Sequence, residues 1–310
     1  MTTARATDPV AREVDASRAR YPDEEGYAER DGVRLHFEIY GAGEPTIVLM
    51  PSTPIVHSRQ WKAQIHYLSR HHRVIAYDGR GNGRSDRPTD VASYADDQLV
   101  EDRRAVMDAT ATDRAVLVGL CGDALWPAIQ FAARYPDRVL GMVAFATGVP
   151  LLTPPHPWRV QYGFHDELET DEGWAKLNEH YWRRDYPGFV RFFFGELTSE
   201  PHSTKVLEDI VGWALDGSVE AMLAEGNVES SWTLEAVEAV CRNVRCPLLI
   251  VHGTNDHCQP VSRAHRLAEL TGGRLVIVDG ADHLIPARHP VLANLLIRDF
   301  VQSLSEGVPT

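Results

Sequence analysis

The chain of 310 residues has few cysteines, and the four at positions 121, 241, 246 and 258 form no CxxC pair. Their scarcity argues against a disulfide scaffold, and their spacing matches no zinc motif. Long apolar runs are also missing, both from the first twenty residues and from any window as long as a membrane span. We therefore expect reduced thiols, no bound metal, no transmembrane segment and a cytoplasmic location.

Basic residues are outnumbered as well, with 31 Lys and Arg against 44 Asp and Glu and a formal net charge of −13. A strongly negative chain is repelled by nucleic-acid phosphates and by anionic lipid surfaces. Neither nucleic acid nor a membrane is therefore expected as a partner. With 44% hydrophobic and 24% charged residues, the composition suits a globular protein with a sizeable core.

Short apolar runs rich in β-branched residues alternate with helical patterns along much of the chain. The first is VRLHFEIY, which begins at residue 33, and the last is RLVIVDG, which begins at residue 274. Runs that are apolar at nearly every position suit strands of a parallel sheet covered on both faces, so we predict an α/β fold with a mostly parallel central sheet. Residues 1–25 are polar and lack periodicity, which predicts a mobile N-terminal arm or an edge extension, with regular structure beginning near Gly26.

The alternation stops at Pro150. Residues 151–234 lack comparable apolar runs but are dense in aromatic residues and histidine. We interpret this block as a helical cap inserted into a core made of residues 26–150 and 235–310. Aromatic residues at helical spacing more often pack in a core than line a pocket, so a role in substrate binding is the less favoured alternative. His156, Trp158 and Trp182 are retained as candidate substrate contacts.

A cysteine lies where a strand is predicted to turn directly into a helix. The strand pattern VLVGL is followed at once by the helical pattern CGDALWPAI, so Cys121 occupies the turn. A free cysteine is most often a small buried residue, and that reading stays open here. The turn favours a nucleophile instead, because a helix start and a neighbouring histidine both lower the pKa of a thiol. A decayed site and a Ser-to-Cys change are the remaining alternatives.

Two polar stretches follow later strands. HGTNDHCQP places Asp256 beyond one strand, and GADHLIPARHP places His283 beyond the next. A turn-forming carboxylate and a surface histidine are the alternatives. The order of nucleophile, acid and histidine, each past the carboxyl end of a strand, instead predicts a catalytic triad. In it Cys121 attacks a carbonyl carbon, His283 accepts the thiol proton and Asp256 orients the imidazole.

Together with YDGRGNGRSDRP after an earlier strand, these motifs resemble the α/β-hydrolase superfamily, in its cap-domain esterase and epoxide-hydrolase-like branch, over about residues 26–305. The resemblance implies an α/β-hydrolase fold. The usual elbow of the family is G-x-S-x-G, whereas here Cys121 replaces the serine and Asp123 the second glycine. A cysteine at this place is similar to dienelactone hydrolases and polyhydroxyalkanoate synthases. Asp123 is interpreted as a first-turn carboxylate favoured by the helix dipole, with tuning of the thiol pKa or a substrate contact as the alternative.

The resemblance also implies an oxyanion hole. The HGxP segment of the family corresponds here to Pro51-Ser52-Thr53-Pro54, in which the prolines have no N–H group. We therefore expect the backbone N–H groups of Thr53 and Gly122 to stabilise an oxyanion, with the hydroxyls of Ser52 and Thr53 as further donors. Ser52 and His57 are also retained as tentative substrate contacts.

These expectations converge on a cofactor-independent acyl hydrolase that acts on an ester, lactone or thioester through an acyl-thioester. Its substrate would be a small acyl compound, either free or linked to a carrier or to coenzyme A. Transfer of the acyl group to an amine, alcohol or thiol is the alternative, and a ligand-binding receptor on the same fold is less favoured. Epoxide-hydrolase chemistry is disfavoured because such relatives carry an aspartate at the position of Cys121. The oligomeric state stays open.

Overall fold

The structure, a computed structural model, describes residues 18–151, 159–201 and 204–306. An eight-stranded sheet runs through its centre in the order β1-β2-β4-β3-β5-β6-β7-β8. The strands are β1 (Glu24–Arg30), β2 (Val33–Tyr40), β3 (Ile47–Leu49), β4 (Val74–Tyr77), β5 (Ala115–Leu120), β6 (Val139–Phe145), β7 (Leu248–Gly253) and β8 (Arg274–Val278). The pairs β1–β2 and β2–β4 are antiparallel and the other five are parallel. The predicted α/β class with a mostly parallel sheet is confirmed.

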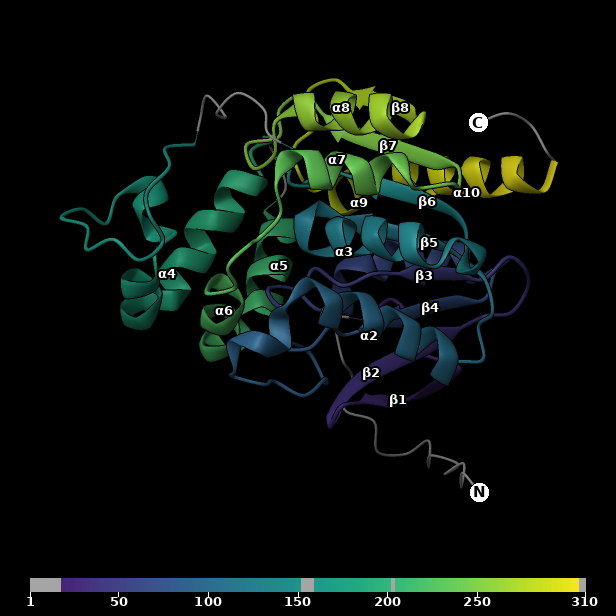
Figure 1. The fold of residues 1–310 in the computed structure, drawn as a ribbon, viewed down its shortest axis with the longest axis horizontal. Coiled ribbons are helices and arrows are strands. Elements are labelled where there is room, and N and C mark those ends of the chain that lie inside the picture. The colour runs from purple at the N-terminus through teal and green to yellow at the C-terminus, as the bar shows by residue number, and fades with distance from the viewer. Residues whose placement is uncertain (1–17, 152–158, 202–203, 307–310) are drawn as a thin grey trace.

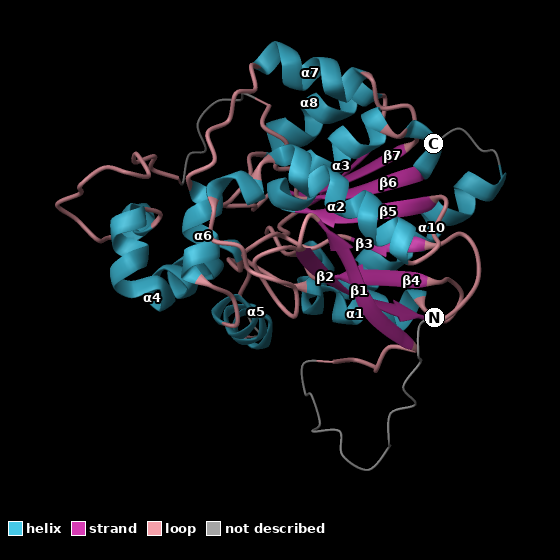
Figure 2. Cartoon of the chain, turned by 60° about the horizontal axis from the view of Figure 1, so that its bottom comes forward, coloured by secondary structure: helices cyan, strands magenta, loops and turns pink. Residues whose placement is uncertain are grey.

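Helices cover both faces of the sheet (Figures 1 and 2). One layer consists of α2 (Asp96–Ala109), α3 (Cys121–Arg134), α7 (Leu234–Arg242) and α8 (Val261–Thr271), and the other of α1 (Lys62–Leu68), α9 (Ile285–Arg288) and α10 (Pro290–Glu306). Successive residues of a strand point to opposite faces. Thus Val116 and Val118 of β5 belong to one hydrophobic cluster and Leu117 between them belongs to the other. Both faces of the strand are buried, which explains why its sequence is apolar throughout.

The N-terminal edge of the sheet differs from the prediction. The arm was expected to extend to residue 25, but β1 begins at Glu24, and Arg18 already forms an ion pair with the buried Glu38 (2.7 Å). The strand was missed because an edge strand has one neighbour and is half-solvated, so that only Ala28 of EEGYAER is buried. Residues 1–17 lie outside the described part of the chain.

Between β6 and β7 the chain forms α4 (Glu179–Leu197), α5 (Lys205–Leu215) and α6 (Val219–Gly226), and residues 159–201 and 204–234 contain no strand. These helices form a group beside the sheet, at the left of Figure 1. Most aromatic side chains of α4 pack among themselves, as where Trp182 lies 4.6 Å from Phe189 between ring centroids. The division of the chain into a core and a cap remains a prediction.

The glycine-rich stretch at residues 77–88 forms a turn after β4 that is tied to α2 by a buried ion pair. The guanidinium of Arg80 donates from Nε and Nη2 to the two carboxylate oxygens of Asp102, both at 2.6 Å. Arg30 of β1 donates to the same carboxylate (3.1 Å). Asp102 therefore joins an edge strand, a turn and a helix through one buried charge.

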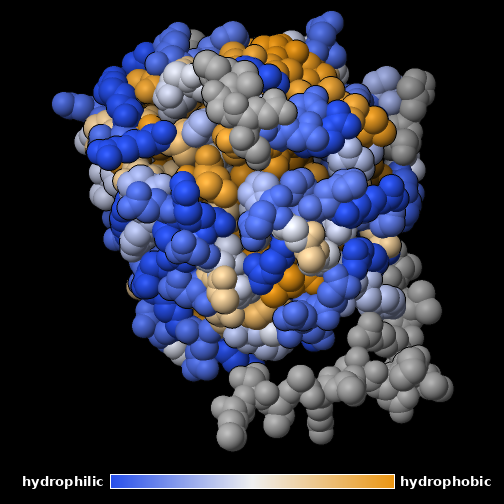
Figure 3. Space-filling model, turned by 90° about the vertical axis from the view of Figure 1, so that its right-hand side faces the viewer, coloured by the Kyte–Doolittle hydropathy of each residue, from blue (hydrophilic) through white to orange (hydrophobic). Residues whose placement is uncertain are grey.

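On the face opposite α4, hydrophilic side chains dominate and hydrophobic ones show in patches between them (Figure 3). No helix in the described ranges is both long enough and apolar enough to cross a membrane.

Candidate active site

Cys121 occupies a strained turn between β5 and α3. Its φ is +66°, a value that residues with a side chain rarely adopt and that persists only where the surroundings enforce it. The turn is tight: a Cβ added to Gly122 would lie 2.8 Å from the carbonyl oxygen of Gly148, and one added to Gly119 would lie 2.6 Å from Met50. The turn therefore depends on the missing side chains of these two glycines. The side chain of Asp123 is outside what the structure describes.

His283 and Asp256 meet beside this turn, although 27 residues separate them in the chain. His283 Nδ1 donates to Asp256 Oδ2 at 2.8 Å, and both side chains are buried. The other carboxylate oxygen accepts from the backbone N–H groups of Cys258 and Gln259, each at 2.8 Å. The carboxylate is therefore held from two sides, and its orientation fixes that of the imidazole.

A second histidine, which the sequence analysis did not select, also contacts the carboxylate. Thr147 donates its backbone N–H to His252 Nδ1 (3.1 Å), so His252 carries its proton on Nε2. That nitrogen lies 3.0 Å from the carbonyl oxygen of Gln259 and 3.2 Å from Asp256 Oδ2. In the sequence, His252 is only the end of a strand, and nothing marks it as a partner of Asp256.

The charges of the three predicted catalytic groups are coupled. Burial alone would raise the pKa of Asp256, but the charge of His283 and hydrogen bonds from both histidines outweigh burial and hold this pKa well below its usual range. Burial likewise opposes the charged form of His283, whose pKa is nevertheless raised well above its usual value by Asp256 and by the thiolate form of Cys121. The Asp256–His283 pair therefore binds its proton strongly.

The expected lowering of the Cys121 pKa is wrong in direction. The neighbouring Cys258 thiol is the largest cause that raises the pKa of Cys121, burial is the second, and the attraction of His283 does not compensate for them. The helix start predicted from the sequence is present, but the sequence did not reveal that a second thiol lies against the first. We therefore expect a neutral Cys121 thiol at rest, which loses its proton to His283 as the sulfur attacks.

Two further residues beside Cys121 were missed. The Sγ atoms of Cys121 and Cys258 and a ring nitrogen of His283 all lie within 4.8 Å of one another. The side-chain amide of Gln259 donates toward both sulfurs, at 3.8 Å for Cys121 and 3.6 Å for Cys258. The order HCQP next to Asp256 resembles an ordinary loop, and only the fold turns it toward the nucleophile.

Cys121 and His283 line a cavity of about 280 Å³ that lies between the strand ends and the helices α4 to α6. Its wall is mainly apolar and aromatic, with Leu177, Trp182, Phe189, Phe193, Phe194, Leu197, Ile210, Met222 and Leu284 among its residues. Ser52, Gln259 and Arg159 are polar members of the wall. The Nε1 atom of Trp182 is buried and has no hydrogen-bond partner within the described ranges.

The structure does not bring all of the other predicted site residues to this cavity. Gly122 lies in the first turn of α3, where backbone N–H groups lack partners within the helix. Thr53 is buried with its side chain toward Gly79 and does not line the cavity, and His57 lies near Trp213 and Asp216 instead (His57 Nε2 to Asp216 Oδ2, 3.7 Å). His57 is thus not brought to the cavity. His156 and Trp158 fall outside the described residues.

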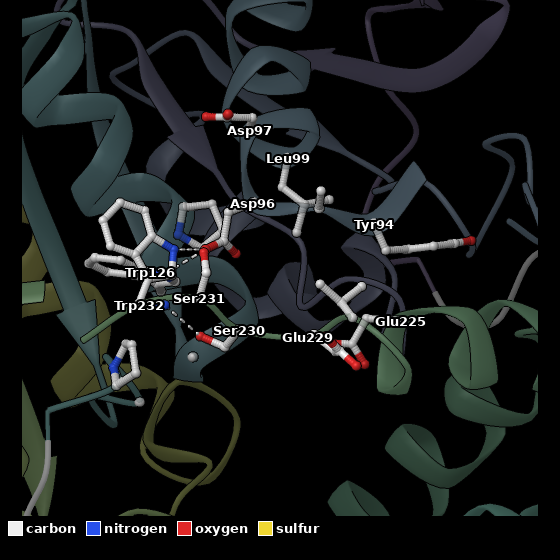
Figure 4. Close-up of a pocket in the computed structure, with 16 residues that line it drawn as sticks. Tyr94, Asp96, Asp97, Leu99, Trp126, Glu225, Glu229, Ser230, Ser231 and Trp232 are labelled. Carbon is white, nitrogen blue, oxygen red and sulfur yellow. Dashed lines mark hydrogen bonds between the residues drawn. The ribbon is translucent and has the colours of Figure 1, made fainter. Parts of the chain in front are cut away.

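A second cavity, of about 420 Å³, lies next to the same turn (Figure 4). Asp96 accepts hydrogen bonds there from the indole nitrogens of Trp126 (2.9 Å) and Trp232 (2.6 Å), and Asp97, Glu225 and Glu229 also line it. Of the predicted site residues that the structure describes, Gly122 alone borders this cavity. The smaller, apolar cavity is therefore the candidate substrate pocket.

A strained strand-to-helix turn, a buried Asp–His pair and a pocket at the strand ends are the features expected of an α/β hydrolase. In agreement, a family model described as the alpha/beta hydrolase fold matches residues 45–290, and the chain belongs to this family.

Two curated relatives match over most of their own length and most of this chain. The mouse protein named serine hydrolase BPHL is 28% identical over 280 residues, which cover 88% of this chain and 84% of the relative. The bifunctional esterase/perhydrolase DCH of Acinetobacter calcoaceticus is 26% identical, with 88% and 98% covered. Among solved structures, an esterase of Exiguobacterium antarcticum matches with a TM-score of 0.75 at 18% identity, covering 89% of this chain and 98% of that one. At 18% identity, the similarity to this esterase structure shows a shared fold and nothing more.

Proposed function

We propose that the protein hydrolyses a carboxylic ester or lactone through an acyl-thioester on Cys121. The observation that carries the proposal is the positive φ of Cys121 at the strand-to-helix turn, with the His283–Asp256 pair beside its sulfur. Hydrolases and an esterase among the curated relatives support the reaction class. Because Cys121 stands where the usual G-x-S-x-G elbow has a serine, the acyl-enzyme would be a thioester.

The proposed reaction has two halves. Cys121 Sγ attacks the carbonyl carbon while its proton passes to His283, and the resulting oxyanion is stabilised by the N–H of Gly122 and a second donor from the Ser52–Thr53 segment. Collapse of this intermediate breaks the bond to the alkoxide, which takes the proton from His283 and leaves a thioester. In the second half, His283 deprotonates a water that attacks the thioester, and the acid departs as the thiol is restored.

The pocket argues for a compact, mainly apolar acyl group. Its volume of about 280 Å³ lies near the lower end of the range for small-molecule sites. Aromatic and aliphatic side chains of α4 to α6 form most of its wall. A long chain or a nucleotide-bearing carrier would have to extend beyond this volume.

Intact-mass measurement tests the proposal. The reduced protein is mixed with a panel of activated esters and lactones of increasing acyl size, quenched in acid and weighed. We expect the mass to rise by one acyl group, the added group to map to the peptide of Cys121, and the adduct to be absent from Cys121→Ala. Release of the alcohol without an adduct would count against covalent catalysis. Recovery of the acyl group on an added amine or thiol would identify a transferase.

The oxyanion donor can be tested by a substitution outside the three triad residues. A Cβ at Gly148 would lie 2.4 Å from the backbone nitrogen of Gly122, 2.7 Å from its Cα and 3.2 Å from the carbonyl carbon of Cys121, so Gly148→Ala requires the backbone of this turn to shift. Loss of one such donor typically costs about 100- to 1,000-fold in rate, and we expect a fall of that size in acylation measured by stopped flow. The matched control is Gly212→Ala on α5, where an added methyl group meets no atom within 4 Å. Equal rates in the two variants would remove Gly122 from the mechanism.

A further inference from the structure

Three side chains with soft donor atoms converge at the nucleophile turn. The sulfur atoms of Cys121 and Cys258 and one ring nitrogen of His283 lie within 4.8 Å of one another. Because Nδ1 of His283 is bonded to Asp256, Nε2 is the nitrogen that remains for the sulfurs. The proposed acyl-transfer mechanism uses Cys121 and His283 but has no step for Cys258, although this thiol is buried against the nucleophile. Its presence there calls for a separate explanation.

Two thiolates and an imidazole are the donor set of a zinc site with an open position. In such Cys₂His sites the metal lies about 2.3 Å from sulfur and about 2.0–2.1 Å from nitrogen, and a water or a ligand takes the fourth corner. Tetrahedral angles then place the two sulfurs about 3.8 Å apart. The three donor atoms already lie within 4.8 Å of one another, so small side-chain movements suffice to enclose an ion. The fourth corner would face the cavity that Cys121, Cys258 and His283 line.

The surroundings of His283 fit the same role. Metal-bound histidines commonly donate their second ring N–H to a carboxylate, which orients the ring and strengthens the bond to the metal. Asp256 accepts such a bond from His283 at 2.8 Å and is itself held by two backbone N–H groups. Two thiolates would also neutralise the double charge of the ion within a buried site. The ligands come from three separate loops, which explains why the spacing of cysteines along the chain shows no zinc motif.

We propose that Cys121, Cys258 and His283 bind one Zn²⁺ ion per chain. Binding replaces the two thiol protons and requires a free electron pair on Nε2 of His283, so a site with a neutral imidazole releases two protons and a site with a charged imidazole releases a third. The ion engages the sulfur and the imidazole nitrogen of the triad, and it therefore blocks acylation until a chelator removes it. The binding part stands by itself, whereas the inhibition part rests on the proposed function.

The test uses the full chain, reduced and freed of metal, without any acyl substrate. Zn²⁺ is titrated in competition with a chromophoric chelator, and Co²⁺ is used as a spectroscopic substitute. We expect one equivalent to bind and the cobalt form to show a thiolate-to-metal charge-transfer band. Asp256→Asn should weaken binding about 10- to 100-fold, as loss of an outer-shell partner does, and Cys258→Ser should weaken it further. The matched controls Cys241→Ser and Cys246→Ser should bind as the unaltered chain does.

Alkylation of the unaltered chain keeps the test independent of how well a variant folds. One equivalent of Zn²⁺ should slow iodoacetamide labelling of Cys121, with peptide mapping as the readout. Unchanged labelling, tight binding in a folded Cys258→Ser protein, or a cobalt spectrum without the charge-transfer band would each overturn the metal site. A chain that binds zinc but is never acylated would overturn the proposed function and leave the metal site standing. Acylation without zinc binding would do the reverse.

Discussion

Replacing His283 by alanine should lower the single-turnover acylation rate by about four to six orders of magnitude. The thiol pKa of Cys121 is raised, so the sulfur is a poor nucleophile until a base takes its proton, and His283 is the base within reach. Loss of a nucleophile or its base in triads of this kind removes nearly all of the covalent rate and leaves what binding and the oxyanion donors supply. Rapid quench with an activated ester, followed by intact-mass analysis, measures the rate directly.

His265→Ala is the matched control, because that histidine is exposed on α8, and its acylation rate should stay within about twofold of that of the unaltered protein.

The role of Asp256 can be tested through the pH dependence of the acylation rate. Acylation needs neutral His283, whose pKa is raised, so the rate should fall as the pH drops through a value above the usual 6.5 or so. Asp256→Asn removes a cause of that raised pKa. It should move this limb to lower pH and lower the plateau by about 10⁴-fold. If Asp256→Asn left the acidic limb of the pH profile at the same pH, a residue other than Asp256 would have to orient His283.

Asp102→Ala should lower the free energy of unfolding by about 3–5 kcal/mol. Arg80 is fully buried and places two hydrogen bonds on this carboxylate, and Arg30 adds a third contact. Deleting one partner of a buried ion pair leaves the other charge desolvated and uncompensated, which costs far more than the intact pair contributes. Denaturant titration followed by circular dichroism provides the measurement.

Asp97→Ala on the same helix is the control. Its side chain is 73% exposed and pairs with Arg134 at the surface, so its removal should change the unfolding free energy by less than about 1 kcal/mol. If Asp102→Ala behaved like Asp97→Ala, water would have to reach Arg80 in the folded protein. The link between the glycine-rich turn and α2 would then contribute little to stability.

Local patterns along the chain were sufficient for the fold class and for the order of the site residues. The seven strands from β2 to β8 were predicted from short apolar runs rich in β-branched residues. Burial on both faces accounts for this pattern in central strands such as β5, whereas the edge strand β8 has the pattern although it is only partly buried. Cys121 was singled out because a strand pattern changes to a helical pattern at that residue. Both signals arise within about ten residues and need no distant partner. The edge strand β1 was missed because its sequence EEGYAER is polar and has no apolar run.

The contacts that set the chemistry come from segments far apart in sequence. Cys258 lies against Cys121, and His252 lies against Asp256. The first of these contacts changes the direction of the thiol pKa shift that the helix start alone would predict. Likewise, Thr53 and His57 are close to Ser52 in the chain, but only Ser52 borders the cavity.

The sequence by itself thus determined the α/β fold, the turn that displays Cys121, and the order of the acid and the histidine, because periodicity and turn chemistry are local properties. The tertiary structure alone decided which second thiol and which amide lie beside the sulfur, and how large the pocket is. The physical reason is that the pKa of a thiol, the atoms around it and the volume of a cavity depend on distances of a few ångströms between distant segments. Those distances cannot be read from how far apart the segments lie along the chain.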